Sequence, residues 1–392
     1  MKNTLILDGQ QRSALAATRS LGKRGVSVYV AEAKRPCLAG RSRFCRESIQ
    51  LPSAEHAPEV FIEALREVIA HHRIKVLLPM TDITTATVLR FRQQLGDVAL
   101  PCPTFDHYDA VTNKNTLFKT AQAMGIPMPR TLFIEQREQL APLLAQLTYP
   151  IVIKPAYSRI FANNQWLNTA VSFADSEQAL LGRIENTAWL REHPFMLQAY
   201  IEGEGQGLFA LFDNGKPLVY FSHRRLREKP PSGGVSVLCE STAVNEQMRS
   251  IAAKILADAQ WHGVAMVEFK VSPEGTPYLM EVNGRFWGSL QLAIDAGVDF
   301  PYLTYQLATH TTDAPVGDYR TGIRNRWLLG DLDRLYLVLK DRTGRYSRRA
   351  KWQEIVTFLN FFEKNTRFEV NRFGDMGPFY YELRQYLTDL VK

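Results

Sequence analysis

Two apolar runs joined by a short turn constrain the fold of this chain more than any other feature. Residues 266–271 and 278–282 flank the turn Pro-Glu-Gly-Thr-Pro, a pattern typical of a β-hairpin. Glu268 belongs to the first strand, and Glu281 and Asn283 belong to the second. Alternate residues of a strand share a face and cross-strand neighbours lie about 5 Å apart, so these three side chains are expected to converge. Their oxygen atoms suit Mg²⁺ and its nucleotide phosphates.

The alternative for this hairpin is an ordinary solvated face. Its neighbours argue against that interpretation, because residues 264–267 and 278–280 are strongly apolar. Carboxylates in such surroundings are costly to bury without a counter-charge. A bound cation is therefore the more specific hypothesis.

Composition places the chain among ordinary globular proteins. It has 392 residues, 45% of them hydrophobic and 22% charged, which is enough for two or three domains. The formal charge of +7 is modest and fits acidic small molecules, nucleotides included, as well as it fits nucleic acid. The basic residues are spread out except for a cluster at 342–351, and we expect no nucleic-acid partner.

Cysteine usage and hydropathy indicate the cellular compartment of the chain. Its four cysteines form no Cys-x-x-Cys pair, so free thiols in a reducing cytoplasm are expected. No uncharged apolar run approaches the roughly 18 residues that a membrane span needs. We therefore expect a cytoplasmic chain without a membrane partner, and a homodimer is left open.

The opening segment alternates strands and helices, which predicts a parallel sheet with helices on its faces. The expected strands are 4–7, 26–30 and 75–79, and the expected helices are 13–23 and 60–71. The loop 8–13 joins the first strand to its helix, a common ligand-facing position. It has one glycine rather than a Gly-x-Gly-x-x-Gly series, so no dinucleotide site is predicted. Thr81-Asp82 follows a later strand in the same way, where helix capping is the simpler interpretation.

A break at Pro101-Cys-Pro103 separates this segment from a second one. A helix over 111–124 follows, and Gly125-Ile-Pro-Met-Pro129 ends it. Residues 131–267 then mix strands and helices, and the chain is expected to turn helical again beyond Pro301. Predicted boundaries are 1–102, 103–310 and 311–392.

Two lysines and one glycine turn suggest an anion site. Lys154 ends the apolar run 150–155, where an ammonium must emerge or meet an anion, and Lys114 lies near the start of a helix. Each is more often a surface charge when taken alone. The segment 195–205 is a strand that runs into a glycine turn with two acids. Its backbone can face an adenine and an acid can accept ribose hydroxyls, although a plain turn is the alternative.

In order and spacing these pieces resemble the ATP-grasp family, with a grasp module like that of carbamoyl phosphate synthase. The resemblance covers roughly residues 100–300, and the opening segment looks like the family's preceding domain. No single piece is specific, and the order of the five carries the resemblance. The pieces are Asn113-Lys114 with 125–129, Ile153-Lys154-Pro155, 198–204, Glu268, and Glu281-Val-Asn283-Gly-Arg285.

The resemblance implies an α/β fold: an N-terminal parallel-sheet pre-grasp domain, a two-lobed α+β ATP-grasp module and a helical C-terminal extension. It also implies ATP and Mg²⁺ as cofactors. By this resemblance Lys114 and Lys154 contact the ATP phosphates, and adenine is framed by Gln198, Ala199, Tyr200 and Ile201. Glu204 holds the ribose, with Glu202 as the alternative. Magnesium is bound by Glu268, Glu281 and Asn283, and Arg285 contacts the γ-phosphate or an acyl-phosphate.

One part of the family pattern is missing. Members usually carry a glycine-rich loop after the first strand lysine, where backbone amides cover the phosphates. Residues 156–164 contain no glycine. Either Ser158, Arg159, Asn163 and Asn164 take over that work with side chains, or the loop closes differently.

A basic strand end adds a candidate substrate contact. The segment 223–227 contains three arginines, and guanidinium groups capture carboxylates or phosphates in a bidentate manner. An exposed hairpin tip is the alternative, but the resemblance favours Arg225 and Arg285 as contacts to a carboxylate or acyl-phosphate. The chain is thus expected to be an ATP-dependent ligase that joins a small carboxylate to an amine. The alternative is a nucleotide-binding scaffold or sensor without catalysis.

Overall fold

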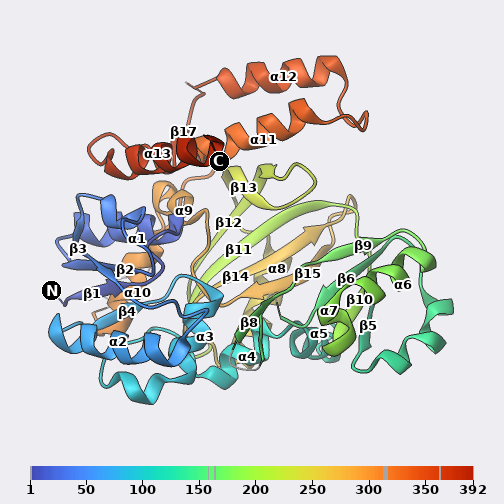
Figure 1. The fold of residues 1–392 in the computed structure, drawn as a ribbon, viewed down its shortest axis with the longest axis horizontal. Helices are drawn as coiled ribbons and strands as arrows, with labels where there is room; N and C mark the ends of the chain where they lie inside the picture. The colour runs from blue at the N-terminus through green and yellow to red at the C-terminus, as the bar shows by residue number, and fades with distance from the viewer. Residues whose placement is uncertain (1, 158, 163–164, 312–316, 362, 392) are drawn as a thin grey trace.

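A parallel sheet opens the chain, as the alternating pattern predicts (Figure 1). The computed structural model describes residues 2–157, 159–162, 165–311, 317–361 and 363–391. The sheet has the strand order β3-β2-β1-β4. Its strands are β1 (Thr4–Ile6), β2 (Val28–Glu32), β3 (Cys45–Gln50) and β4 (Val76–Leu78), and its helices are α1 (Arg12–Lys23), α2 (Pro58–His71) and α3 (Asp82–Arg90). The sequence analysis did not predict β3.

Both faces of this sheet are buried, as is usual for parallel strands. Ile6 and Leu78 point to the α1 side, whereas Leu5 and Leu77 point to the α2 side. The first of these two cores continues across α1 into helices of the next segment, including Leu290. The predicted boundaries at 102 and 310 stay predictions, because one hydrophobic core spans both sides of each.

A four-stranded sheet, here called the small lobe, follows in the order β5-β10-β6-β9. Its elements are β5 (Thr131–Ile134), β6 (Ile151–Pro155), β9 (Ser172–Ala174), β10 (Phe195–Ala199), α6 (Glu177–Asn186) and α7 (Ala188–Glu192), and the hairpin β7 (Arg159–Ala162) with β8 (Gln165–Asn168) lies beside it. The single helix expected over 111–124 was wrong. Two helices, α4 (Phe105–Thr112) and α5 (Lys114–Ala123), meet at Asn113, whose side chain caps α5 by accepting from the backbone N–H groups of Asn115 and Thr116.

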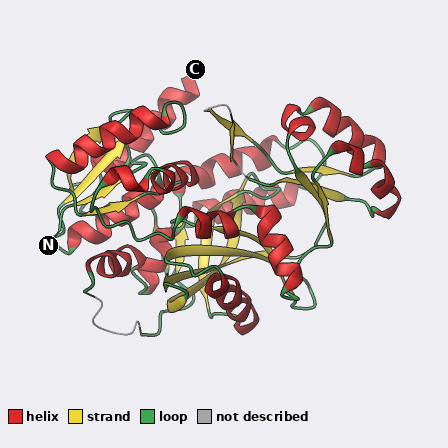
Figure 2. Ribbon diagram, turned by 90° about the horizontal axis from the view of Figure 1, so that it is seen from below, coloured by secondary structure: helices red, strands yellow, loops and turns green. Residues whose placement is uncertain are grey.

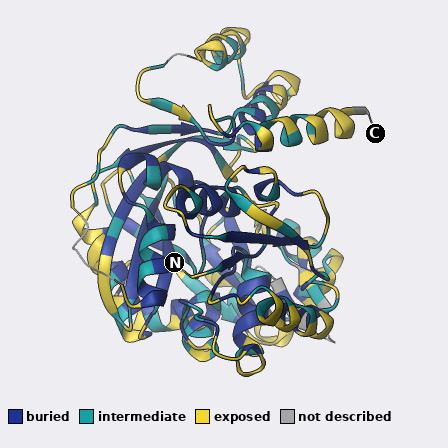
Figure 3. Cartoon of the chain, turned by 90° about the vertical axis from the view of Figure 1, so that its left-hand side faces the viewer, coloured by how far each residue is buried: buried dark blue, intermediate teal, exposed yellow. Residues whose placement is uncertain are grey.

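A seven-stranded sheet, here called the large lobe, has the order β15-β14-β11-β12-β13-β16-β17. Its first five strands are β11 (Glu204–Asp213), β12 (Lys216–Lys229), β13 (Val235–Thr242), β14 (Gly263–Val271) and β15 (Pro277–Asn283). Helix α8 (Glu246–Asp258) packs on one face, against Leu208. Helices α9 (Leu290–Ala296) and α10 (Phe300–Thr309) pack in the core on the other side, with Phe209. Figure 3 shows this interior as a continuous buried region.

The segment beyond residue 310 is mainly helical, as expected, with α11 (Leu328–Lys340), α12 (Arg348–Leu359) and α13 (Gly377–Val391). It also contains two short strands that the sequence analysis did not predict, β16 (Arg324–Arg326) and β17 (Thr366–Phe368). Because β16 pairs with β13, this segment extends the large sheet. None of the helices in the described ranges combines the length and apolarity needed to cross a bilayer.

A buried ion pair joins the C-terminal segment to the N-terminal one. The backbone of the two segments can be followed in Figure 2, where the chain ends in α13 beside the N-terminal segment. Arg19 Nε on α1 lies 2.7 Å from Asp375 Oδ2, and the two side chains are 3% and 5% exposed. The other guanidinium nitrogens donate to the backbone oxygens of Glu369, Val370 and Asp375. The C-terminal segment is thereby fixed to the N-terminal sheet.

Candidate functional site

The late hairpin forms as predicted and brings its polar side chains together. Strands β14 and β15 pair with Glu268 opposite Glu281, next to a β-bulge between Glu268 and Phe269. The Asn283 amide donates to Glu268 Oε1 at 3.3 Å and to Glu281 Oε1 at 3.2 Å. The turn is closed by a hydrogen bond from Ser272 N to the Thr276 carbonyl. The convergence expected from the strand register is confirmed.

Two cations pair with these acids. Lys114 Nζ lies 3.2 Å from Glu281 Oε2, and Arg225 Nη2 lies 2.7 Å from Glu268 Oε2. Lys114 is the first residue of α5, a helix that packs in the core of the large lobe, and Arg225 lies on β12 of that lobe. Lys154 Nζ, from β6, reaches the Met280 carbonyl at 3.5 Å. Both predicted lysines therefore reach the acid-bearing hairpin, and Lys154 reaches it from the small lobe.

Burial and neighbouring charges shift the pKa values of the two glutamates in opposite directions. Burial tends to raise the pKa of Glu281, but Lys114 and Lys154 outweigh it and hold that pKa at about 2. Burial raises the pKa of Glu268, and the nearby Glu281 adds to this rise although Arg225 opposes it. Burial lowers the pKa of Lys154 to about 8, because the ammonium is largely removed from water. A charged ligand bound at this place would shift the pKa values of all three groups.

The donor set fits magnesium. Two carboxylates and one amide meet at hydrogen-bonding distance, and Mg²⁺ prefers oxygen ligands with some positions left to water and phosphate. The amide oxygen of Asn283 now accepts from Arg285 at 3.2 Å, so a half-turn of that amide would present it to the ion. Within the described ranges no group of three His, Cys, Asp or Glu side chains forms a metal cluster. A third side-chain oxygen at this place would have to come from Asn283.

Arg285 connects the hairpin to the N-terminal sheet. Its Nε lies 2.9 Å from Asp82 Oδ2, while its Nη2 donates to Asn283. Sequence reasoning had assigned Thr81-Asp82 to helix capping. Thr81 does cap α3, because its hydroxyl accepts from Thr84 N, but the ion pair of Asp82 was missed. Its place at the end of the turn between β4 and α3 is a ligand-facing position, but no sequence signal indicated the ion pair.

The predicted adenine segment links the two lobes. Strand β10 ends at Ala199, so Tyr200 and Ile201 lie outside the ladder between the small and large lobes. Gln198 is fully buried and donates to Thr131 Oγ1 at 2.9 Å, so its side chain is held within the small lobe. Tyr200 is 48% exposed.

The acids beside this segment are exposed, and neither Glu202 nor Glu204 is singled out as a ribose contact by its surroundings. Gly203 between them has a clear structural role. A Cβ on this residue would lie 2.1 Å from the Val271 carbonyl, so only glycine lets the chain pass β14 here.

The glycine-free loop starts at an anchored tyrosine. Tyr157 donates from its hydroxyl to Asp109 on α4 at 3.0 Å and accepts from the Asn113 amide at 2.7 Å. Ser158, Asn163 and Asn164, three of the predicted phosphate-covering residues, lie outside the described residues. The fourth, Arg159, is described only as part of β7.

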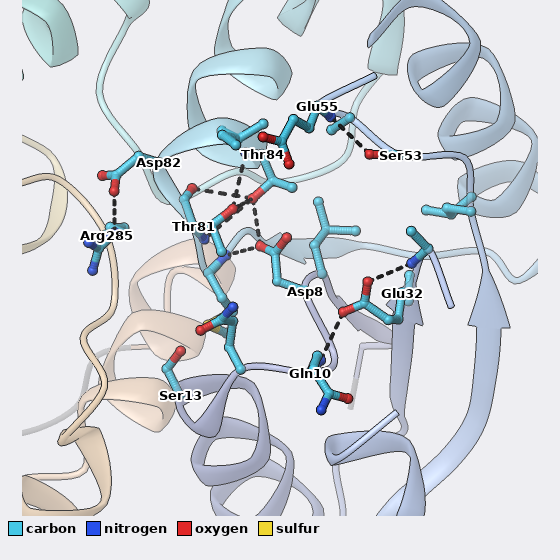
Figure 4. Close-up of a pocket in the computed structure, with 18 of the residues that line it drawn as sticks. Asp8, Gln10, Ser13, Glu32, Ser53, Glu55, Thr81, Asp82, Thr84 and Arg285 are labelled. Atoms are coloured by element: carbon cyan, nitrogen blue, oxygen red, sulfur yellow. Dashed lines mark hydrogen bonds and ion pairs between the residues drawn. The ribbon is translucent and has the colours of Figure 1, made fainter. Parts of the chain in front are cut away.

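Two cavities flank the contact between Asp82 and Arg285. One of about 550 Å³ is lined by the loop 8–13, the carboxyl ends of β2 and β4, and Arg285 (Figure 4). The other, of about 200 Å³, is lined by aromatic side chains, including Tyr108 and Trp166, together with Lys114 and Asn283. Asp82 borders both. The loop 8–13, which the sequence marked as a common ligand-facing position, therefore lines a cavity.

One family model and several curated proteins match part of this chain. Residues 191–330 match the family described as "ATP-grasp in the biosynthetic pathway with Ter operon". The carbamoyl phosphate synthase large chain of Pyrococcus furiosus is 21% identical over 226 residues, which are 56% of this chain and 20% of that protein. This chain thus spans about a fifth of the length of the curated relatives it matches.

Solved structures match over most of the chain. An L-amino acid ligase from Bacillus licheniformis has a TM-score of 0.64 at 17% identity, covering 83% of this chain and 78% of that one. A biotin carboxylase from Campylobacter jejuni has a TM-score of 0.66 at 14% identity, covering 83% and 74%. At these identities the likeness shows the fold. Residues 191–330 thus match an ATP-grasp family model, and most of the chain shares the fold of these two solved structures.

Proposed function

We propose that this protein is an ATP-dependent ligase that activates a small-molecule carboxylate as an acyl-phosphate and joins it to an amine, releasing ADP and phosphate. The observation that carries the proposal is the cluster of Glu268, Glu281 and Asn283, faced by Lys114 and by Lys154 of the small lobe. Half-buried acids opposed by buried lysines form a site of the kind that a metal-bound triphosphate requires.

Nucleotide binding is assigned to the junction of the lobes. Lys114 and Lys154 would contact the phosphates, since both ammonium groups lie beside the hairpin acids. The backbone from Gln198 through Ala199, Tyr200 and Ile201 would frame the adenine, because the chain leaves the β-ladder there. Glu204 would hold the ribose.

Metal binding is assigned to Glu268, Glu281 and Asn283. The ion, when bound, would neutralise charge that develops on the transferred phosphoryl group. Arg285 is held by Asp82 and Asn283, so its guanidinium is oriented at the edge of the acid cluster. It would bind the γ-phosphate or the acyl-phosphate, and fixed donors of this kind stabilise developing negative charge without reorganising.

Arg225 is the second proposed carboxylate contact. Its guanidinium already pairs with Glu268 and with Glu228 at 3.0 Å, and the Glu268 carboxylate raises its pKa further. When an ion takes over the charge of Glu268, Arg225 is released to bind an incoming carboxylate. The carboxylate oxygen would then attack the γ-phosphorus, ADP would leave, and the amine would attack the acyl carbon with loss of phosphate.

The test is ADP release with pooled carboxylates and amines, together with binding of MgADP. A ligase should release ADP only when both substrate classes are present. A nucleotide-binding scaffold or sensor, the alternative, should bind MgADP and respond to no pair. Glu281→Gln should remove turnover, whereas Glu274→Gln, in the exposed turn of the same hairpin, should retain it.

A further inference from the structure

The 550 Å³ cavity beside Arg285 has no role in the proposed handling of ATP. It lies at the carboxyl ends of the parallel strands, the edge at which open α/β sheets bind their ligands. Figure 4 shows Asp8, Glu32 and Glu55 on three different segments of its wall. Its volume is in the range of pockets that hold small molecules.

The charges in this wall are not balanced. Its two arginines are neutralised by their own partners, because Arg12 pairs with Glu369 and Arg285 pairs with Asp82. The three carboxylates of Asp8, Glu32 and Glu55 have no ion pair with any residue of the described ranges.

Those carboxylates keep accepting capacity for a ligand. Asp8 Oδ2 takes hydrogen bonds from Met80 N at 2.9 Å and Thr84 Oγ1 at 2.6 Å, which fix the side chain and leave Oδ1 without a bond to a described residue. Glu32 accepts only from backbone amides, those of Gln10 and Ala33. Burial raises the pKa of Asp8 to about 6, so the group still carries its charge at neutral pH.

A continuous set of contacts links the cavity to the acid cluster. Asp82 lines the cavity and holds Arg285, and Arg285 donates to Asn283, which bridges Glu268 and Glu281. A molecule that fills the cavity would therefore have one end beside the proposed site of the acyl-phosphate.

From this arrangement we infer that the cavity binds the amine substrate and selects amines that carry a second cationic group. The second cation would lie between Asp8, Glu32 and Glu55, and the reacting nitrogen would lie toward Arg285. Carboxylates that lack a counter-ion favour such a ligand over a neutral or acidic one, because the ligand supplies the missing charge. This inference rests on the proposed ligase function for the identity of the reaction, while the cation preference rests on the cavity alone.

Calorimetric titration of the full chain without nucleotide tests the preference. The probes are 1,5-diaminopentane and lysine, each compared with a partner that lacks one ammonium group, pentylamine and norleucine. 1,5-Diaminopentane should bind about tenfold more tightly than pentylamine, and lysine about tenfold more tightly than norleucine. This ratio is expected for one additional hydrogen bond to a charged group. Glu32→Gln and Glu55→Gln should each reduce that ratio severalfold. Glu59→Gln, on the exposed first turn of α2, is the matched control and should leave it unchanged.

Equal binding within each pair, or a ratio that survives both cavity variants, would overturn the inference, as would the absence of heat from any probe at millimolar concentration. MgADP titration of the same samples separates this result from the proposed function. A chain that binds MgADP but shows no amine preference refutes the inference alone. A chain that prefers the diamine but binds no nucleotide refutes the ligase function alone.

Discussion

Nucleotide affinity should depend on pH through one lysine. Lys154 is 6% exposed, and burial lowers its pKa to about 8. Only the charged ammonium attracts phosphate, and bound phosphate raises the pKa of the lysine that contacts it. The dissociation constant of MgADP should therefore be flat below pH 8 and rise about tenfold per pH unit above it. At pH 9.5 about 3% of Lys154 is charged in the free protein, so affinity should fall about thirtyfold, or about 2 kcal/mol.

The measurement is a calorimetric or fluorescence titration with MgADP from pH 6.5 to 9.5. Lys154→Met keeps an apolar stem beside Phe118 and should bind weakly with no rise above pH 8. Lys119→Met, an exposed lysine on α5, should keep the native profile. A flat profile for the unmodified chain, or the same rise in Lys154→Met, would refute the assignment of Lys154 to the phosphates.

Loss of affinity at high pH would not reflect unfolding caused by Lys154. Its folded pKa of about 8 lies below the unfolded value of 10.5, so the unfolded state binds more protons between these pH values. Stability contributed by this group therefore increases as pH rises through that window. Thermal unfolding of the nucleotide-free chain at pH 7 and pH 9.5 checks the sign.

Three further results are expected. Glu281→Gln should lower ligase turnover at least a hundredfold with an unchanged far-UV spectrum, and near-native turnover would contradict the metal assignment. Asp375→Asn leaves Arg19 buried without its counter-charge and should lower the free energy of unfolding by about 3–5 kcal/mol, measured by urea titration, whereas Glu246→Gln in an exposed pair should have no measurable effect. His223 is buried with its pKa lowered to about 3, so stability should fall by up to about 1.4 kcal/mol per unit as pH drops from 6.5, and His223→Phe should lose this part of the slope.

Local patterns were sufficient for much of the site. The period-2 alternation and the turn residues fixed the hairpin, so the meeting of Glu268 with Glu281 followed from strand register. The parallel sheet followed from its alternating strands and helices. The helix break at Asn113 was missed because the apolar spacing continues across it, and only the capping bonds of that side chain reveal the new start.

Other parts of the site were not accessible to local reasoning. Asp82 and Arg285 are 203 positions apart, and no pattern in either segment indicates that they pair. The partner of Glu268 was likewise unknown until the strand order placed Arg225 of β12 two strands away from Glu268 of β14, across β11. The cavity acids Asp8, Glu32 and Glu55 lie on separate segments, and the sequence marked only the loop that contains Asp8 as ligand-facing.

The sequence by itself determined the hairpin, the apolar strand that ends at Lys154, the glycine turn between the lobes and the order of these pieces. These features depend on neighbouring residues, whose spacing sets which side chains share a face. Only the tertiary structure decided which charges neutralise one another and which stay unpaired around a cavity. Such pairing depends on distances between distant segments and on the exclusion of water, and both arise only when the lobes and the chain ends pack together.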